Sequence, residues 1–218
     1  MSDTDSFIDE VTEEVRRDRL FAQFKRYGWI GVVVVLAIVG GTAYREYAKA
    51  QEAAQAQALG DSILSALETE DRAARIDALT GVEAPEGGAQ SVLTLLLAAE
   101  EGVEGEDADA VARLQALADD TTQPQIYRQI ASFKALTRGA ESLSLDDRRA
   151  GFQALSVPGQ PLRLLAEEQL ALIEVESGDR EAALSRLQAI IADAEVTAGL
   201  RRRASQWIVA LGGELGQG

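Results

Sequence analysis

The chain has no cysteine, no histidine and no asparagine. Without cysteine and histidine it lacks disulfides, thiolate chemistry, imidazole bases and the usual ligands of zinc, copper and haem. Without asparagine it has no acceptor for N-glycosylation. No run of acidic residues has a spacing that indicates a Mg²⁺ or Ca²⁺ loop. The sequence therefore predicts no cofactor and no metal.

Proline and aromatic residues are scarce. Four prolines and an aromatic content of 5% stand beside a hydrophobic content of 46%, so alanine and leucine supply most of the apolar surface. Both features favour long helices over a β-sandwich. We therefore expect an all-α fold.

Positive charge is also scarce, because the net charge is −15. Residues 1–26 contain five basic and seven acidic residues, which leaves −13 on the rest of the chain. A surface of this sign repels the phosphate backbone, so we expect no nucleic-acid partner.

Residues 27–44 contain no charged side chain. As a helix these 18 residues would span about 27 Å, which is at the short end of what crosses a bilayer. Aromatic residues at both edges match the interfacial belts of membrane helices. The sequence predicts a transmembrane helix anchored in the lipid bilayer by Tyr27, Trp29, Val33, Leu36 and Tyr44.

Two other interpretations of this segment are weighed. A buried helix of a soluble protein rarely runs so far without a polar face. A cleaved signal peptide would use the A-x-A pattern of residues 48–50, but that pattern lies beyond Arg45 and Glu46, and the leader before the apolar run is long and acidic. We favour the membrane anchor over both.

Lysine and arginine are distributed unevenly around the anchor. Only Arg45 and Lys49 fall within the twenty residues after it. The excess before it predicts a cytoplasmic N-terminus at 1–26, a single pass at 27–44, and an outer domain at 45–218, which in a bacterial inner membrane is periplasmic. The residues that set this orientation are Arg16, Arg17, Arg19, Lys25 and Arg26.

A short pattern, apolar–polar–Ala–apolar, occurs four times in the outer domain. Its occurrences begin at residues 76, 114, 152 and 187, so the spacings are 38, 38 and 35 residues, and a proline follows each of the first three. Such a period indicates stacked pairs of helices. The residues that we expect in the repeat core are Ile76, Leu79, Leu114, Leu117, Phe152, Leu155, Leu187 and Ile190.

The expected elements follow from this period. We expect a helix over 45–80 continuous with the anchor, and turns at 102–105, 139–144 and 178–179. In the clearest pair, a helix over 162–176 precedes a second helix whose inner face includes Leu184 and Ala194. A final helix over 201–211 would turn Trp207 and Leu211 inward.

Residues 171–184 read Ala-Leu-Ile-Glu-Val-Glu-Ser-Gly-Asp-Arg-Glu-Ala-Ala-Leu and resemble the middle of a tetratricopeptide repeat. The other units resemble it less, since their period exceeds 34 residues and the Trp and Tyr positions of the first helix are not evident. The resemblance implies a tetratricopeptide-like α-solenoid of helical hairpins.

Residues 8–30 combine an acidic amphipathic stretch, Arg-Arg-Asp, and Phe-Lys-Arg-Tyr-Gly at the entrance to the anchor. With the helical repeats that follow, this arrangement resembles the family of ancillary SecYEG translocon subunits, which are single-pass inner-membrane proteins. The resemblance implies association with the translocon, exported clients and periplasmic chaperones. From composition and periodicity alone, only an anchored protein-interaction scaffold follows.

Other functions remain to be compared with this hypothesis. An assembly factor or accessory subunit of a respiratory or cytochrome c maturation complex would have the same architecture. A carboxylate-based hydrolase would need paired acids, but neighbours such as Glu100 and Glu101 point in different directions on a helix. We therefore expect no enzyme activity.

Two charged segments admit alternatives. Residues 7–24 form either an amphipathic helix that docks on a partner or membrane, or a solvated leader. Residues 201–203 are three consecutive arginines, which we interpret as a solvated helix start rather than a binding site for an acidic partner.

Overall fold

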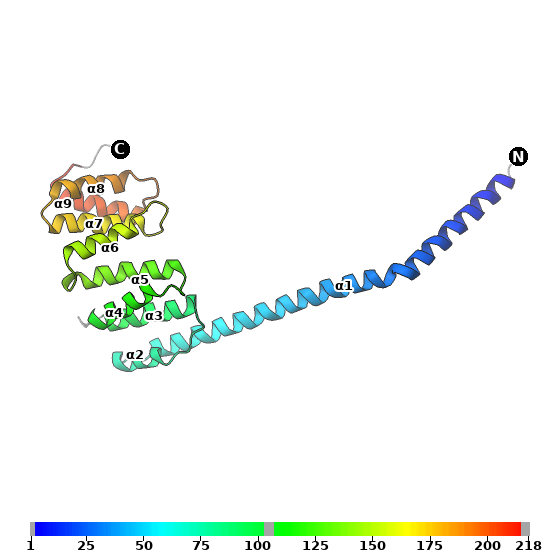
Figure 1. Ribbon diagram of the computed structural model, residues 1–218, viewed down its shortest axis with the longest axis horizontal. Coiled ribbons are helices and arrows are strands. Elements are labelled where there is room, and N and C mark those ends of the chain that lie inside the picture. Colours follow the sequence, from blue (N-terminus) through cyan, green and yellow to red (C-terminus); the bar gives the residue numbers. More distant parts are fainter. Residues whose placement is uncertain (1–2, 103–106, 215–218) are drawn as a thin grey trace. The chain divides into compact units, whose positions relative to one another are not determined.

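The structure is a computed structural model that describes the backbone of residues 3–102 and 107–214 and the side chains of residues 29–102 and 108–214. Within these residues the fold is all-helical, with nine α-helices, one short 3₁₀ helix and no strand (Figure 1). The elements are α1 (Asp3–Leu67), α2 (Arg72–Thr80), α3 (Gly88–Glu101), α4 (Asp107–Asp119), α5 (Gln125–Arg138), η1 (Gly139–Glu141), α6 (Leu145–Leu155), α7 (Arg163–Glu176), α8 (Arg180–Ala192) and α9 (Ala198–Ala210).

The chain divides into two compact units, Met1–Gly60 and Asp61–Gly218. The first unit consists of α1 up to residue 60. The second begins with the last turns of α1 and contains the other helices. Residues 45–60, which the sequence assigns to the outer domain, lie in α1 and fall in the first of these units.

The expected helix over 45–80 is interrupted, so that prediction is wrong at residues 68–71. Helix α1 ends at Leu67, and the Asp71 side chain accepts a hydrogen bond from the Ala74 backbone N–H at the start of α2. An aspartate that satisfies a free N–H starts a new helix, and no proline is needed to end the previous one.

The predicted turns at 139–144 and 178–179 are confirmed. Gly178 has φ of +81°, and Asp179 accepts from the Ala182 N–H to start α8. Ser144 caps α6 in the same way through the Asp147 N–H. A glycine with positive φ followed by a capping residue depends only on adjacent residues, so a turn of this kind can be predicted from the sequence. The turn expected at 102–105 lies mostly outside the described residues.

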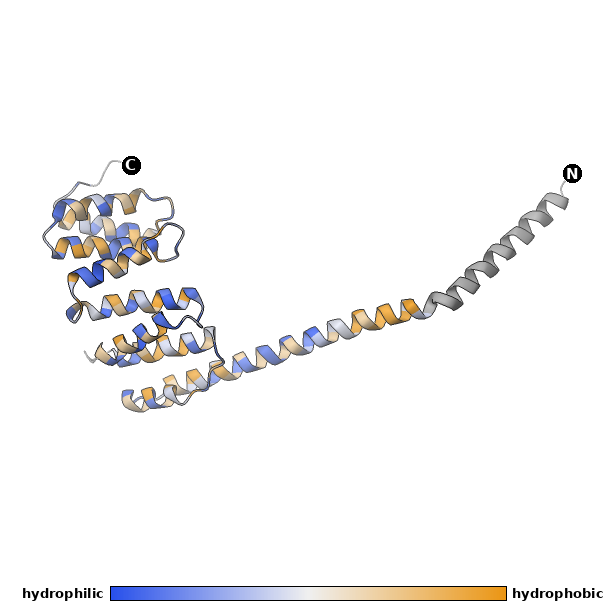
Figure 2. Ribbon diagram, in the orientation of Figure 1, coloured by the Kyte–Doolittle hydropathy of each residue, from blue (hydrophilic) through white to orange (hydrophobic). Residues whose placement is uncertain are grey.

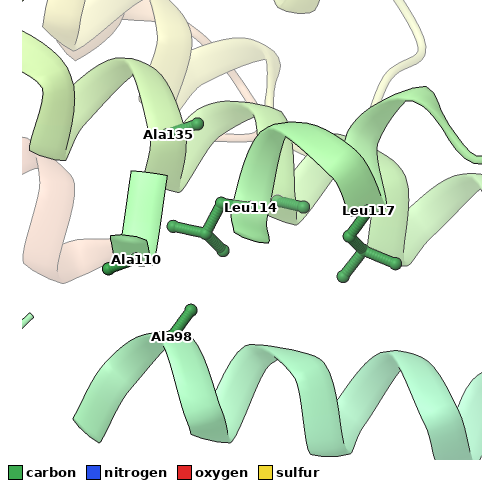
Figure 3. Close-up of a cluster of buried hydrophobic side chains, with 6 residues drawn as sticks. Ala98, Ala110, Leu114, Leu117 and Ala135 are labelled. Atoms are coloured by element: carbon green, nitrogen blue, oxygen red, sulfur yellow. The ribbon is translucent and has the colours of Figure 1, made fainter. Parts of the chain in front are cut away.

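Four hydrophobic clusters form the core of residues 61–214, and each draws on three consecutive helices. The first joins the end of α1 with α2 and α3. The next three join α3–α4–α5, α5–α6–α7 and α7–α8–α9. Helices α3, α5 and α7 thus each contribute to two clusters. Figure 3 shows the second cluster, where Ala98 of α3 and Ala135 of α5 lie on either side of Leu114 in α4.

Each of the four sequence motifs contributes to a different cluster. The motif residues lie on α2, α4, α6 and α8. Seven of the eight predicted core residues are buried, and Ile76 is half-buried against Leu79 and its neighbours. Burying one leucine or isoleucine contributes about 1.5–3 kcal/mol, so each of these positions contributes substantially to the stability of its three-helix cluster.

The prediction for the last helix is wrong about which residues face the core. Helix α9 buries Leu200, Ala204 and Ile208, whereas Trp207 is 38% exposed and Leu211 lies just past the helix, half-buried. The helix begins at Ala198, three residues before the predicted start, because Thr197 caps it through the Leu200 N–H. The expected inner position Ala194 lies beyond the end of α8 and is exposed, whereas Ile190 is buried as predicted.

Candidate membrane span and interhelical groove

Helix α1 contains one stretch that is long and apolar enough to cross a membrane, near the N-terminus. None of its apolar window is buried, and Trp29, Val32 and Leu36 are 60–64% exposed. In Figure 2 the stretch is the continuous orange part of α1. Its exposure disagrees with the interpretation of residues 27–44 as the core helix of a soluble protein, because such a helix is buried.

The hydroxyl group inside this stretch has hydrogen-bond partners in its own helix. The Thr42 hydroxyl donates to the backbone carbonyls of Ile38 and Val39, so it has a partner inside its own helix. Val33 is exposed like its neighbours, and Tyr44 and Tyr47 are 74% and 68% exposed. These side chains are free to meet lipid along the length of the helix.

The side chains of the residues proposed to set the orientation lie outside the described residues, as does that of Tyr27. The backbone of α1 is helical from Asp3, so residues 7–24 are helical as one of their two interpretations requires. Their amphipathic packing stays a prediction.

Arginines placed one residue before three of the four motifs join neighbouring helices. Arg113 on α4 binds Glu101 on α3 through two nitrogens, at 2.6 to 3.1 Å. Arg186 on α8 binds Glu174 on α7 in the same way, at 2.6 and 2.9 Å. In both hairpins the glutamate precedes the arginine by twelve residues. Arg75 on α2 binds Glu100 on α3.

The hairpin formed by α5 and α6 lies between the α3–α4 and α7–α8 hairpins in the chain, and it has glycines at the two positions of the ion pair. Thirty-eight residues after Glu101 and Arg113, the chain has Gly139 and Gly151. A Cβ at residue 151 would lie 2.6 Å from Leu136 Cδ1, and one at residue 139 would lie 2.9 Å from Leu143 Cδ1. Leucines occupy the space, so apolar packing substitutes for the charge pair in α5–α6.

A groove of about 420 Å³ lies along α7 and α8. Its α8 wall consists largely of small side chains, Ala182, Ser185 and Ala189, of which Ser185 and Ala189 are exposed. Its charged lining is Arg163, Glu167, Glu174, Arg186 and Asp193. A second groove of similar volume lies along α4, α5 and the turn after η1 and includes Val111, Gln115 and Leu143.

An ion-pair network fixes the charged side chains of the first groove. Arg186 contacts both Glu167 and Glu174, and Arg163 contacts both Asp193 and Glu195. Glu174 uses only one carboxylate oxygen for Arg186. The other oxygen, Oε2, is buried and accepts no hydrogen bond from the described residues. A buried acceptor without a donor is costly, so it is a favourable contact for an incoming N–H group.

The network shifts the pKa values of its members. The hydrogen bond to Glu174 is the largest cause of a raised pKa at Arg186, which burial partly opposes and Glu167 reinforces. Hydrogen bonds to Asp193 and then Glu195 raise the pKa of Arg163. The guanidinium of Arg163 in turn lowers the pKa of Asp193, with help from the Glu195 N–H.

The basic run at 201–203 is split by the structure. Arg203 binds both oxygens of Glu168 on α7, at 2.6 and 2.7 Å, and Glu168 is only 5% exposed. Arg201 and Arg202 are exposed. All three arginines are exposed, as expected of a solvated run, and Arg203 differs from the other two in that it also pairs with Glu168.

Sequence reasoning missed the arginine–glutamate pairs although a signal was present. The motif extends by one residue to Arg–apolar–polar–Ala–apolar at Arg75, Arg113 and Arg186. The acidic partners had no such signal, because a glutamate at the end of a helix usually lies in solvent. The adjacent acids Glu100 and Glu101 do point to different helices, α2 and α4, as expected.

Within the described residues, no group of three or more acidic side chains is arranged to hold a metal ion. No protein-family model, no curated protein and no solved structure matches this chain. The functional interpretation therefore depends on the span, the repeated hairpins and the groove themselves.

Proposed function

We propose that this protein is a membrane-anchored protein-interaction scaffold without enzyme activity. Residues 27–44 cross the bacterial inner membrane once, residues 1–26 are cytoplasmic, and the helical domain is periplasmic. The observation that carries the proposal is the pairing of a fully exposed apolar stretch in α1 with a domain of sequentially packed helices. An exposed stretch of this kind needs lipid, and such a domain offers surface rather than chemistry.

We propose further that the helical domain is a tetratricopeptide-like solenoid. The four clusters support this, since each is formed by three consecutive helices and α3, α5 and α7 each contribute to two of them. The equivalent ion pairs in α3–α4 and α7–α8 support it as well, because they recur at the same positions of two hairpins.

The groove along α7 and α8 is the proposed client site. Its acidic lining exceeds its basic lining by one charge. A lysine or arginine of an extended client would fit these groups, and the small side chains on α8 let a peptide backbone approach closely. By its resemblance, the protein serves the export translocon and binds exported clients or periplasmic chaperones.

Site-specific photo-crosslinking in intact cells tests this function. A photoreactive amino acid is placed at Ser185 or Ala189 in the groove, with Ala154 on α6 as the matched exposed control. Adducts with translocon subunits, exported proteins or their chaperones from the groove positions, and not from Ala154, would support the proposal. Adducts only with respiratory or cytochrome-assembly subunits would replace it by that alternative.

A hydrolase predicts a different pattern. Its activity would depend on one or two acids such as Glu167 or Glu174, whereas a scaffold would respond to changes anywhere along the groove and to loss of the anchor. Single substitutions of these acids distinguish the two. A hydrolase would lose its activity at one or two of them, whereas a scaffold would lose client crosslinking on changes along the groove and on loss of the anchor.

A further inference from the structure

Helices α3–α5 and α7–α9 repeat one three-helix arrangement. Helices α4 and α8 lie 73 residues apart in the chain, and so do the starts of α5 and α9. At this offset, five of the six buried residues in the cluster of α3–α4–α5, which Figure 3 shows, have counterparts in the cluster of α7–α8–α9. The pairs are Ala98 and Ala171, Leu114 and Leu187, Leu117 and Ile190, Ala131 and Ala204, and Ala135 and Ile208. The two arrangements can therefore be compared position by position.

The same ion pair joins the two helices of each hairpin. Glu101 and Arg113 occupy the positions in α3–α4 that Glu174 and Arg186 occupy in α7–α8. In each pair the arginine donates through Nε and Nη2 to its glutamate. Two hydrogen bonds from one guanidinium fix its orientation, so the charged groups are placed alike on the two hairpins. In α7–α8 both members of the pair line the groove.

The small side chains that line the groove on α8 also recur on α4. Ser185 and Ala189 correspond to Ala112 and Ala116, and all four side chains are exposed. On α4 the two alanines are four residues apart and lie beside Arg113 on one side of the helix. A peptide backbone can therefore approach this side of α4 as closely as the α8 wall of the groove.

This side of α4 is more acidic than the groove. Three differences change its charge, because Gln90, Thr94 and Asp109 stand where the groove has Arg163, Glu167 and Ala182. One basic and three acidic groups remain, so the net charge is −2 against −1 for the groove, and these groups are Arg113, Glu101, Asp109 and Asp120. The hydrogen bond to Glu101 is the largest cause of the raised pKa of Arg113, which burial opposes and the charges of Glu101 and Asp109 reinforce. Asp109 thus belongs to the same group of charges.

The carboxylate at the end of α4 is held differently from its counterpart at the end of α8. Asp193 pairs with Arg163, whereas Asp120 accepts hydrogen bonds from Thr122 and Gln123. These two donors are neutral, so they orient the carboxylate of Asp120 without neutralising it. A cation that approaches α4 meets an oriented negative charge there.

We propose that this surface is a second client site. The α4 face, defined by Glu101, Asp109, Ala112, Ala116 and Asp120, takes the same class of ligand as the groove along α7 and α8, which is an extended segment with lysine or arginine side chains. The carboxylates bind the cationic side chains, and the two alanines let the peptide backbone lie against the helix. The inference rests on the client site proposed above.

Two sites on one domain change how a client is held. A segment bound at one site brings its neighbouring residues close to the other, so the second binding event is intramolecular and gains from a high effective concentration. The α5–α6 hairpin has Gly139 and Gly151 at the positions of the ion pair, so we expect no site there. The proposal therefore predicts two sites for a short peptide, and each can be weak.

Titration calorimetry on the full-length protein in phosphatidylcholine nanodiscs counts these sites. The probe is a short synthetic peptide of alternating lysine and serine, and the same peptide with acetylated lysines tests the need for charge. Empty discs are the blank. Ala116→Trp blocks the α4 face and Ala189→Trp blocks the groove. Ala154→Trp, at the same motif position of α6, is the matched control, and all three alanines are exposed.

We expect two bound peptides per protein in the wild type and in Ala154→Trp. Ala116→Trp and Ala189→Trp should each lose one, the double variant should lose both, and the acetylated peptide should not bind. Circular dichroism melting checks that each variant is folded. If Ala116→Trp melts early, Ala112→Trp, one turn before it on the α4 face, replaces it.

The outcomes separate the second site from the first. A single bound peptide, lost in Ala189→Trp and kept in Ala116→Trp, would overturn the α4 face and leave the α7–α8 client site intact. Two bound peptides in both Ala116→Trp and Ala112→Trp would also overturn it, because the second site would then lie elsewhere. No binding to the wild type would contradict the client site itself, and the second site with it.

Discussion

At the scale of single residues, adjacent arginines of α9 have opposite roles. Arg203 neutralises Glu168, which is almost fully buried, whereas Arg201 extends into solvent. Removing one partner of a buried pair leaves the other charge uncompensated, and this cost exceeds the value of the pair itself.

We therefore predict that Arg203→Ala lowers the free energy of unfolding by about 1–3 kcal/mol, less than for a fully buried pair because the Arg203 side chain is half-exposed. Arg201→Ala is the matched control and should change it by less than about 0.5 kcal/mol. Urea unfolding followed by circular dichroism measures both. Equal effects would show that the Glu168 pair does not stabilise the junction of α7 and α9.

Phe152 is the largest fully buried side chain of the domain and packs edge-on against Phe133, with ring centroids 5.6 Å apart. Phe152→Ala should cost about 3–5 kcal/mol, because it removes a large apolar surface and leaves a cavity. Val157→Ala, at a position 49% exposed, should cost less than about 0.5 kcal/mol. A comparable loss of stability in both variants would contradict the placement of Phe152 in the core.

The ion pair of Arg163 and Asp193 gives the domain a dependence on pH. The folded-state pKa of Asp193 is lowered, so its stabilising effect is complete above the ordinary aspartate pKa and disappears as the pH falls through the lowered value. The stability difference between the wild type and Asp193→Asn should thus be largest near pH 7 and shrink in acid below about pH 4. Thermal melts over this range measure it. A difference that grows on acidification would contradict the pairing.

At the scale of elements, the connections between helices depend on capping residues and on glycine with positive φ. Gly178, at φ of +81°, lets the chain reverse between α7 and α8. Gly178→Ala should destabilise the domain by about 1 kcal/mol, because an L-residue is strained there. Gly199→Ala, within α9 and facing open space, should be neutral or stabilising by a few tenths of a kcal/mol. Calorimetric melting midpoints that fall equally in both variants would exclude backbone strain as the cause.

Sequence patterns were sufficient for the features that depend on local chemistry. The all-helical class, the turn at Gly178 and Asp179, and the burial of Leu114, Phe152 and Leu187 all follow from periodicity and capping. The end of α1 at Leu67 did not, because the turn contains neither glycine nor proline and depends on one capping aspartate.

Other features depend on packing between helices and could not be predicted from a single sequence. The sequence predicts Trp207 on the inner face of the last helix, but the side chains that pack against α7 and α8 are Leu200, Ala204 and Ile208. The partner of Arg203 lies thirty-five residues earlier on another helix. Nothing in the spacing of Arg201, Arg202 and Arg203 distinguishes the one that is paired.

At the scale of the whole molecule, the proposed function combines a single membrane span with a helical domain that binds proteins. The exposed apolar part of α1 and the sequentially shared clusters of α2–α9 describe the two units, each by itself. The chain from Tyr44 to Gly60 stays helical, and these residues extend about 25 Å along the axis of α1.

The absence of cysteine makes the topology directly measurable, because any introduced thiol is unique. Two single-cysteine variants, Ser6→Cys in the N-terminal segment and Ala154→Cys at an exposed position of α6, are treated with a membrane-impermeant maleimide in spheroplasts of a Gram-negative host. The account predicts that residue 154 is labelled in intact spheroplasts and residue 6 only after lysis. Labelling of residue 6 alone before lysis would reverse the orientation, and labelling of both before lysis would contradict a single pass at residues 27–44.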